Sequence, residues 1–267
     1  MKKLLLACLL TLSALPCRAE TKIISLMPAF TEILFAVGAS SQVAGIGNFC
    51  DWPPEAVKLP RMGDLLAPDM EKIAAAKPDI IIIGKWKSSP TGERLRNAGF
   101  TVKELPDAES IEGIYANITA VGEMAGRRAE AAALVGKMKK ELAKIAKLPG
   151  GKHPSVYAEV DAKHWTTGGD TFLSDIIEKA GGRNVFSGKK GFFQASWEDI
   201  VSANPDIIVD LSYAKTDFSK LPGAKTVTAV KNHSILTGLD KNLLTRPGPR
   251  AVEAVRVMRS AISENKR

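Results

Sequence analysis

Short apolar runs alternate along the chain with longer stretches in which apolar residues recur every three or four positions. The short runs have the length of buried strands, and the longer stretches have the period of amphipathic helices. Strands separated by helices predict parallel sheets with helices packed on their faces, so the fold class is α/β. The predicted strands are Lys22–Met27, Val43–Gly47, Asp79–Ile83, Thr101–Leu105, Ser155–Val160, Asp206–Leu211 and Ser234–Thr237.

Residues 110–148 differ from the rest because they contain helical spacing and no strand pattern. Ser110 is a suitable helix start, and Pro149-Gly150-Gly151 ends the stretch. An unbroken helix of about 38 residues would span roughly 55 Å. The pattern therefore predicts one long helix that runs from one domain to another.

One segment of the chain occurs twice. Residues 71–83 and 198–210 match at seven of thirteen positions, and both read as a short amphipathic helix, a Pro-Asp turn and a buried strand. Pro78 and Pro205 end the helix, since proline lacks an N–H group and clashes with the preceding turn. The repeat predicts two similar Rossmann-like α/β lobes, residues 20–109 and 149–267, joined by the helix over 110–148. A chance likeness between two common local units is the alternative.

The N-terminus has the layout of a secretory signal. Lys2 and Lys3 precede an apolar stretch of about 12 residues, whereas a membrane-spanning helix needs about 20. Small residues at positions 17 and 19 predict cleavage after Ala19, so residues 1–19 are interpreted as a signal peptide and the mature protein is expected in the periplasm. An uncut anchor and a lipidated Cys17 are the alternatives.

Composition narrows the choice of class. Beyond residue 19 the chain has one cysteine, Cys50, so no internal disulfide is expected and its thiol should be buried or unreactive. The net charge of +8 falls to about +5 without Lys2, Lys3 and Arg18. Basic and acidic residues are interspersed, and no basic run with aromatic residues occurs, so a nucleic-acid partner is not expected.

Catalytic and metal-binding patterns are missing. Cys50 stands where a dinucleotide loop beginning at Gly45 needs its third glycine, and the loop from Gly182 to Lys189 has one residue too many for a phosphate loop. The carboxylates of Glu159 and Asp161 are interpreted as a polar strand end. No metal site is expected, because the histidines are scattered; they are His153, His164 and His233.

Aromatic residues gather in loops that follow predicted strands. In open α/β sheets these loops form the ligand crevice, where flat rings offer stacking area. Arg246-Pro247-Gly248-Pro249-Arg250 is a rigid turn that opens the last helix, and Arg246 could donate hydrogen bonds to a ligand. Packing within each lobe is the alternative role for these side chains. The aromatic residues concerned are Phe49, Trp52, Trp86, Trp165, Phe192, Phe193 and Trp197.

Five segments together carry a family resemblance. The chain resembles the helical-backbone class of periplasmic binding proteins, which serve ABC importers for cobalamin, haem and ferric siderophores. The likeness covers nearly all of the chain beyond residue 19, and the first two segments look most like the cobalamin-binding branch. The segments are Ser25–Glu32, Asp51–Ala56, Glu71–Ile83, Gly181–Phe186 and Arg246–Arg250.

The resemblance implies two lobes with little hinge motion and a ligand held between them. It implies no resident cofactor and no catalysis; cobalamin or a related corrinoid is the favoured transported ligand. Leucine at 65 and 66 replaces an expected aromatic residue, and the segment 242–245 lacks the acidic and aromatic residues of cobalamin binders. The implied ligand contacts are Phe49, Leu65 or Leu66, Trp86, Trp165, Phe192 or Phe193, and Asn242 to Arg246.

In the same family a glutamate on each lobe docks into the two halves of the importer's transmembrane dimer. Glu71 and Glu198, which open the two copies of the repeat, match those positions. Identical residues on two similar lobes suit a partner with two-fold symmetry. We therefore expect a monomer that delivers its ligand to an ABC importer. A haem or ferric-siderophore binder of the same class is the first alternative, and an exported enzyme on this scaffold is the second.

Overall fold

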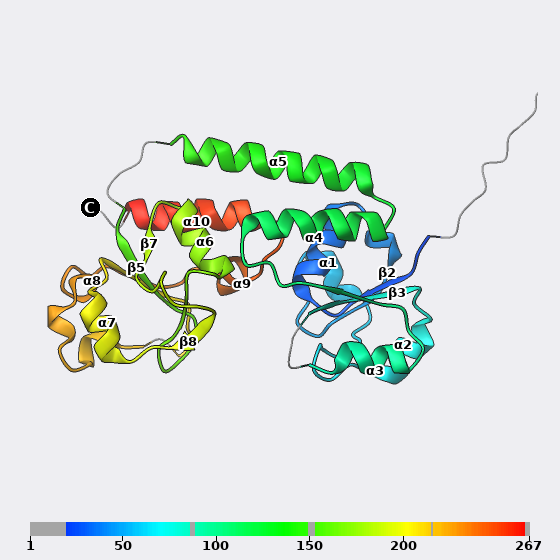
Figure 1. Ribbon diagram of the computed structural model, residues 1–267, viewed down its shortest axis with the longest axis horizontal. Helices are drawn as coiled ribbons and strands as arrows, with labels where there is room; N and C mark the ends of the chain where they lie inside the picture. The colour runs from blue at the N-terminus through cyan, green and yellow to red at the C-terminus, as the bar shows by residue number, and fades with distance from the viewer. Residues whose placement is uncertain (1–19, 86–88, 149–152, 215, 265–267) are drawn as a thin grey trace, which may run out of the picture.

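Two four-stranded parallel sheets form the centres of two lobes in the computed structural model (Figure 1). The structure describes residues 20–85, 89–148, 153–214 and 216–264. The predicted signal peptide over 1–19 and the predicted ligand contact Trp86 lie outside these ranges. Each of the predicted strands is found, with ends shifted by one or two residues, so the α/β fold class is confirmed.

The two sheets have the same strand order. The N-terminal lobe has the order β2-β1-β3-β4 and the C-terminal lobe β7-β5-β9-β10, so each lobe places its first strand second and its third strand beside it. The bounds in the N-terminal lobe are β1 Ile23–Ser25, β2 Val43–Ile46, β3 Ile80–Gly84 and β4 Val102–Leu105. The bounds in the C-terminal lobe are β5 Ser155–Glu159, β7 Arg183–Asn184, β9 Ile207–Asp210 and β10 Ile235–Leu236.

Helices pack around both sheets (Figure 1). The N-terminal lobe has α1 Pro28–Ala36, α2 Met70–Ala76 and α3 Thr91–Asn97, with short 3-10 turns at η1 Ser40–Gln42 and η2 Pro54–Lys58. The C-terminal lobe has α6 Phe172–Lys179, α7 Trp197–Ala203, α8 Thr228–Lys231, α9 Lys241–Thr245 and α10 Ala251–Glu264, with η3 Phe218–Lys220 and η4 Ala224–Thr226. An antiparallel ribbon of β6 Trp165–Thr167 and β8 Phe192–Gln194, which the sequence did not predict, completes this lobe.

The repeated segment has the same structure in both lobes. α2 and α7 end at Lys77 and Asn204, each in the left-handed conformation with φ of 49° and 43°. After the proline, the carboxylates of Asp79 and Asp206 accept hydrogen bonds from the backbone N–H of Lys22 and Ser155, at 2.7 and 2.8 Å. The Pro-Asp pair therefore ends each helix and also fixes the start of the neighbouring strand.

The prediction of one unbroken helix over 110–148 is wrong. The segment forms α4 Ile111–Met124 and α5 Arg128–Ala146, and α5 turns back over α4 (Figure 1). Gly126 has φ of 68°, its N–H bonds to the carbonyl of Glu123, and the N–H of Arg127 bonds to the carbonyl of Gly122, which is a Schellman ending. α5, about 28 Å long at 1.5 Å per residue, therefore lies across the side of both lobes as the second arm of a helical hairpin.

Cys50 is fully buried in the N-terminal lobe, where the hydroxyl of Thr31 donates to its sulfur at 3.2 Å. Burial raises the pKa of this thiol above 9.0, as expected for an unreactive cysteine. Within the described ranges, every helix is too short or too polar to cross a bilayer.

Candidate ligand-binding site

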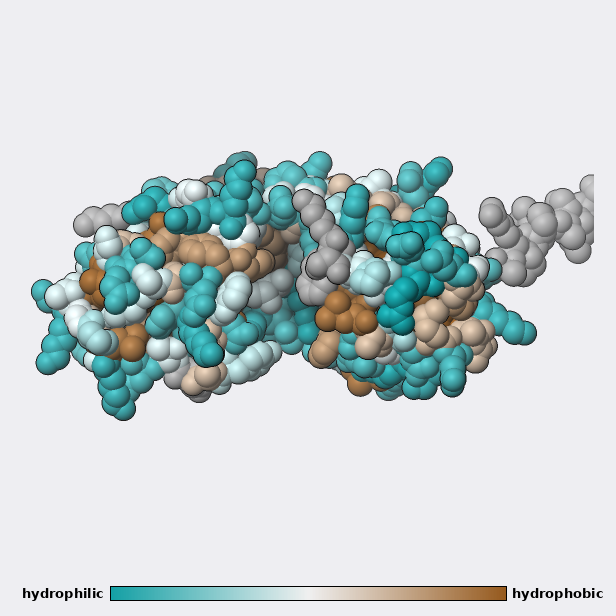
Figure 2. All heavy atoms as spheres, turned by 60° about the horizontal axis from the view of Figure 1, so that its bottom comes forward, coloured by the Kyte–Doolittle hydropathy of each residue, from teal (hydrophilic) through white to brown (hydrophobic). Residues whose placement is uncertain are grey.

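A cleft of about 410 Å³ lies between the two lobes. Figure 2 shows it as a recess with apolar surface on both sides. The N-terminal lobe contributes the start of α1, the segment 106–109 and Asn117 of α4. The C-terminal lobe contributes residues 170–173, 191–192 and 245–247. Most of these residues lie in loops or at helix starts on the side where the parallel strands end, so both sheets position the walls.

The β6/β8 ribbon supplies an aromatic wall from the C-terminal lobe. Trp165 pairs with Gln194 and Thr167 with Phe192. Because side chains alternate along a strand, Trp165 and Phe192 stand diagonally on one face of the ribbon. Their side chains are 43% and 54% exposed, and both line a second pocket that adjoins the cleft through Phe192 and Thr245. Both predicted rings are therefore available to a ligand.

The pairing of the ribbon places Phe192 and Phe193 on opposite faces, a distinction that could not be made from the sequence. Phe193 lies on the opposite face and meets the ring of Phe186 edge-on at 5.5 Å. It packs against the core of the C-terminal lobe. Phe192 is thus the cleft residue of the two, and the prediction for Phe193 is corrected to a packing role.

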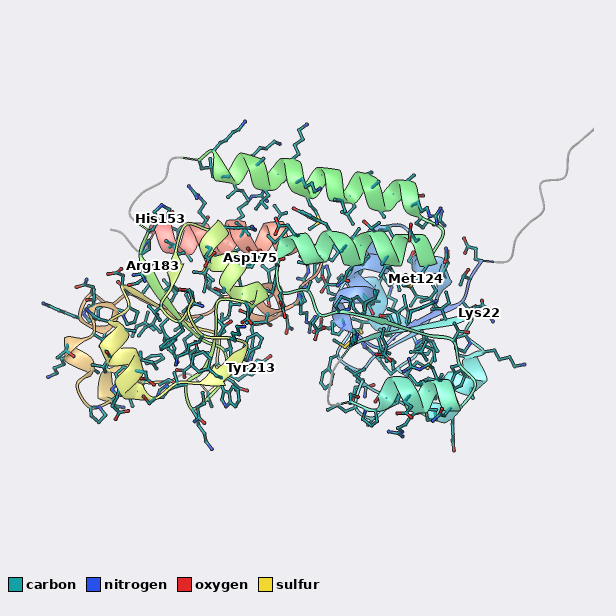
Figure 3. The ribbon with its side chains drawn as sticks, viewed as in Figure 1. Lys22, Met124, His153, Asp175, Arg183 and Tyr213 are labelled. Atoms are coloured by element: carbon teal, nitrogen blue, oxygen red, sulfur yellow. The ribbon has the colours of Figure 1, made fainter. Side chains whose placement is uncertain are left out.

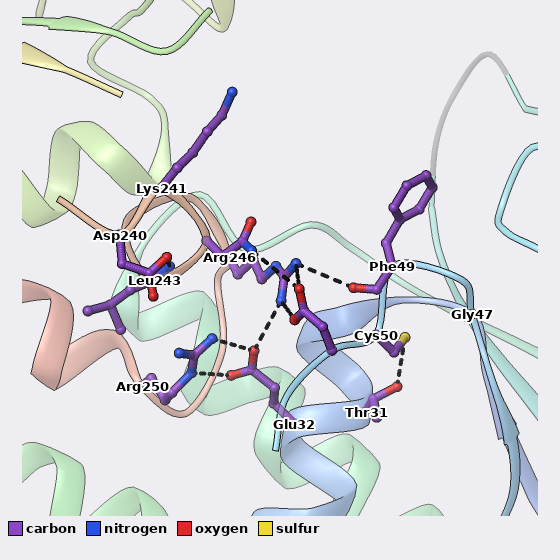
Figure 4. Close-up of polar contacts among 12 residues, drawn as sticks. Thr31, Glu32, Gly47, Phe49, Cys50, Asp240, Lys241, Leu243, Arg246 and Arg250 are labelled. Carbon is purple, nitrogen blue, oxygen red and sulfur yellow. Dashed lines mark hydrogen bonds and ion pairs between the residues drawn. The ribbon is translucent and has the colours of Figure 1, made fainter. Parts of the chain in front are cut away.

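A similar correction applies to Leu65. This side chain is only 6% exposed and belongs to the core of the N-terminal lobe, whereas the next residue, Leu66, is exposed. Leu66 is consequently the member of this pair that a ligand could touch. Phe49 is exposed as expected, and its ring points away from the ion pairs formed nearby (Figure 4).

Four charged side chains from the two lobes form a cluster at the edge of the cleft (Figure 4). Arg250 donates two hydrogen bonds to the Glu32 carboxylate, at 2.9 and 2.8 Å. Arg246 forms a two-pronged ion pair with Asp51, and it donates to the carbonyl of Phe49 at 3.3 Å. We call Glu32, Asp51, Arg246 and Arg250 the cross-lobe cluster.

The cluster favours the charged forms of Asp51 and Arg250. The hydrogen bond from Arg246 lowers the pKa of Asp51 below 3.8. Burial opposes the charge on Arg250, but the hydrogen bonds and charge of Glu32 outweigh it and raise the pKa of Arg250 above its ordinary value. The guanidinium of Arg250 also lies 4.7 Å from the centre of the Trp52 ring. Asn242 donates to Asp51 at 3.3 Å, so the predicted ligand residues Asn242 and Arg246 are both occupied by the opposite lobe.

The other charged residues of the cleft lining are acidic. Asp107 and Glu109 come from the loop before α4, and Asp170 comes from the loop before α6. Asp170 also accepts a hydrogen bond from the N–H of Gly191 at 2.6 Å, which fixes the loop that carries Phe192. Arg246 is the only basic residue among the described residues that line this cleft. The cleft therefore combines apolar surface with carboxylate acceptors.

A buried carboxylate supports the aromatic wall from behind. Glu159, at the end of β5, is fully buried and accepts hydrogen bonds from His164 at 2.9 Å and Tyr157 at 3.0 Å. The hydroxyl of Thr216 donates to its other oxygen. His164 immediately precedes Trp165, so this network fixes the loop that presents the tryptophan. The interpretation of Glu159 as a polar strand end missed this role.

The two predicted docking residues occupy equivalent positions. Glu71 and Glu198 are each the second residue of their helix, α2 and α7. Both side chains are exposed, and among the described residues neither carboxylate has an ion-pair partner. α2 and α7 lie on the side of the molecule opposite α5, one on each lobe (Figure 1).

Tyr213 is a further exposed residue on the C-terminal lobe. Figure 3 shows Asp175 where α6 meets the start of α4, and it shows Tyr213 on the side of the C-terminal lobe that faces the N-terminal lobe. The amino group of Lys241 lies 4.4 Å from the centre of the Tyr213 ring. Both residues line a pocket at the carboxyl ends of β9 and β10, which meets the pocket of Trp165 at Lys241. The cleft thus continues as a groove along the C-terminal lobe.

Sequence reasoning missed the acidic residues of this site. Glu32, Asp51, Asp107 and Asp170 come from four separate segments, and only the fold brings them together. The one signal available was that Glu32 and Asp51 both lie inside segments that carry the family resemblance.

Known proteins share this architecture. A Bacillus subtilis protein named "Uncharacterized ABC transporter substrate-binding lipoprotein YvrC" is 33% identical, with 90% of this chain and 79% of that protein aligned. The "Vitamin B12-binding protein" of Vibrio cholerae is 27% identical over 92% of this chain and 90% of its own. A crystal structure from Staphylococcus epidermidis, described as a possible iron-binding, periplasmic solute-binding protein, is 32% identical with a TM-score of 0.80, covering 92% of this chain and 99% of that one.

The match to a whole family is equally extensive. Residues 23–241 match the family described as periplasmic binding protein, which includes both sheets, the α4–α5 hairpin and most of the cleft. Proteins of this family are the substrate-binding components of ABC importers rather than enzymes. This chain belongs to the periplasmic binding protein family.

Proposed function

We propose that the protein captures cobalamin or a related corrinoid in the interlobe cleft and delivers it to an ABC importer. The observation that carries this proposal is the chemistry of the cleft lining. Trp165 and Phe192 offer flat apolar area, Asp107, Glu109 and Asp170 offer acceptors, and the single arginine is already paired with Asp51.

A corrinoid matches that lining. Its macrocycle has a broad face for contact with rings, and its edge carries amide groups that donate hydrogen bonds to carboxylates. Haem carries two propionates, and many ferric siderophore complexes are anionic, so the acidic lining would repel them. The vitamin B12-binding relative from Vibrio cholerae supports the same choice.

Calorimetric titration of residues 20–267 tests the ligand. We expect saturable one-to-one binding of cyanocobalamin at submicromolar Kd, with much weaker binding of haemin and of a ferric siderophore run in parallel. Quenching of the total tryptophan fluorescence on binding should be smaller in a Trp165→Leu variant, and the difference would assign that part of the response to the aromatic wall. A clear response to an iron complex with none to cyanocobalamin would overturn the proposed ligand.

Haem or a ferric siderophore is the second candidate, and one observation favours haem. Haem iron needs an axial side chain, and Tyr213 is exposed in the groove that continues the cleft. Haemin binding with a tyrosinate absorption band, lost in Tyr213→Phe, would support this candidate. The similarity to the possible iron-binding protein of Staphylococcus epidermidis supports this second candidate.

Glu71 and Glu198 are proposed to dock the two lobes on the importer's transmembrane dimer in the periplasm. Both carboxylates are exposed at equivalent helix positions and have no ion-pair partner among the described residues, so arginines on a symmetric partner could reach both at once. We expect Glu71→Arg with Glu198→Arg to abolish ligand uptake in cells while the purified variant binds ligand like the wild type. The same change at Glu123 and Glu264, also exposed, is the matched control. Unchanged uptake in the first double variant would sink the docking role.

A further inference from the structure

The charge state of the cleft depends on one residue of the opposite lobe. Arg246 is the only basic residue in the described lining of the interlobe cleft, and its side chain is 14% exposed. Both terminal nitrogens of its guanidinium face the Asp51 carboxylate, in the geometry that arginine otherwise uses to bind a ligand carboxylate or phosphate. Asp51 thus occupies the place of an anionic ligand group.

Asp51 is itself held in position. Asn242 donates to its second oxygen at 3.3 Å, and the carbonyl of Phe49 takes a further hydrogen bond from Arg246 at 3.3 Å. Glu32 comes only within 4.0 Å of Arg246, and both its oxygens already accept from Arg250. Asp51 is therefore the nearer of the two carboxylates and the one that forms hydrogen bonds with Arg246.

The four members of the cross-lobe cluster sum to zero charge. With Asp51 neutral, the cluster would carry one net positive charge, directed at the cleft by Arg246. With Asp51 charged, Arg246 is already paired, and a ligand carboxylate in the cleft faces Asp107, Glu109 and Asp170, whereas Lys241 lines only the adjoining pockets. The presence of this one carboxylate separates a cleft that accepts anionic groups from a cleft that rejects them.

We propose that Asp51 is a specificity-determining residue, which occupies Arg246 across the cleft and thereby excludes ligands that carry carboxylates in favour of ligands that carry amides. The inference rests on the proposed function of the cleft. It adds that corrinoids and other macrocycles with carboxylate groups bind weakly. Asp51 acts through Arg246, so it is a positioning residue for the charge of that side chain.

Two matched ligand pairs test the proposal. Cyanocobalamin is compared with its derivative in which one edge amide is hydrolysed to a carboxylate, and haemin is compared with its dimethyl ester. We expect the wild type to prefer cyanocobalamin over the acid derivative by about tenfold or more, and Asp51→Asn to lose most of that preference. For the second pair, Asp51→Asn should bind haemin about tenfold more tightly than the wild type does, with no such gain for the ester.

Further variants separate a charge effect from a structural one. Arg246→Gln should strengthen the preference for amides, because it leaves Asp51 unpaired. The double variant Asp51→Asn with Arg246→Gln has no freed guanidinium, so it should regain the preference that Asp51→Asn alone loses. Asp217→Asn, which removes an exposed carboxylate that pairs with Lys220 and does not line the cleft, is the control and should match the wild type. A double variant that stays as unselective as Asp51→Asn would assign the loss of selectivity to altered packing and overturn the proposal.

The outcomes distinguish the two levels of inference. If the wild type binds cyanocobalamin and the preference is unchanged in Asp51→Asn, the proposed function stands and the role of Asp51 fails. If the wild type binds no corrinoid, the proposed function fails, and the haemin pair still tests Asp51. Equal affinities of wild type and Asp51→Asn for haemin would then overturn the role of Asp51.

Discussion

At the scale of single residues, the junction of the two lobes contains a buried ion pair between Glu32 and Arg250. Glu32 is 3% exposed on its side chain and sits on α1, whereas its partner Arg250 opens α10 from the other lobe. A buried carboxylate is tolerated because two hydrogen bonds from a guanidinium replace the water it has lost. Gly248 stands beside the pair, where an added Cβ would lie 3.3 Å from a Glu32 oxygen. The ion pair therefore depends on a turn of defined shape.

Removing one partner of this pair should be costly. We expect Arg250→Met to lower the free energy of unfolding by about 3 kcal/mol, because it leaves the Glu32 carboxylate buried without its donor. Arg256→Met breaks an exposed pair with Glu141 and should cost no more than about 1 kcal/mol. Urea denaturation of both variants gives the comparison. Equal losses would mean that Glu32 regains water when Arg250 is absent.

The Asp51–Arg246 pair makes a prediction about pH. The pKa of Asp51 is lowered by the hydrogen bond from Arg246, so the pair contributes stability above pH 3.8 and loses it as the pH falls through the still lower pKa of the folded state. We expect the carboxyl carbon of Asp51 to titrate in NMR below 3.8 in the wild type and closer to 3.8 in Arg246→Gln. The same midpoint in both proteins would show that the pair does not persist in solution.

At the scale of elements, periodicity predicted the strands well because each is a short apolar run bounded by polar residues. It failed over 110–148 because α4 and α5 are both amphipathic, and helical spacing continues almost unbroken across their junction. The local signal for the break was Gly126, which can adopt the left-handed conformation that ends α4. The sequence pattern alone could not show that Gly122 allows α5 to fold back.

The β6/β8 ribbon was missed for a different reason. Each strand has only three residues, and their partners lie 25 to 29 positions apart in the chain. So short a pattern carries no period, and only the pairing decides that Phe192 faces the cleft and Phe193 the core. The aromatic composition of the site was therefore predictable, but the choice between neighbouring side chains was not.

Two glycines of the hairpin allow a controlled test of its packing. A Cβ on Gly122 would lie 2.4 Å from the Cβ of Ala131 on α5, whereas a Cβ on Gly136 would meet nothing within 4 Å. We expect Gly136→Ala to stabilise the protein by up to about 1 kcal/mol through helix propensity. Gly122→Ala should destabilise it by about 1–3 kcal/mol, because the crowding outweighs the same gain. Thermal unfolding of both variants should shift in opposite directions, and an upward shift for Gly122→Ala would contradict the hairpin contact.

At the scale of the whole molecule, the two lobes are tied together on more than one side. The N–H of Ile111 at the start of α4 donates to Asp175 of α6 at 2.9 Å, and the cross-lobe cluster joins α1 to the start of α10. α5 packs on both α4 and α10 through side chains spaced seven apart, Ala131, Met138 and Ile145. Ties on several sides oppose hinge opening more strongly than any one of them, so we expect the cleft to be largely formed before a ligand binds.

A preformed cleft predicts little change of shape on binding. We expect the radius of gyration of residues 20–267, measured by small-angle scattering, to change by less than about 1 Å when saturating cyanocobalamin is added. The double variant Asp51→Asn with Arg250→Met keeps the helical ties but loses the charged ones. Without ligand, this double variant should have a larger radius of gyration than the wild type, because the ion pairs between the lobes are lost. An identical curve for variant and wild type would assign the rigidity to the helices alone, and a contraction of several ångströms on binding would replace the fixed cleft with a closing one.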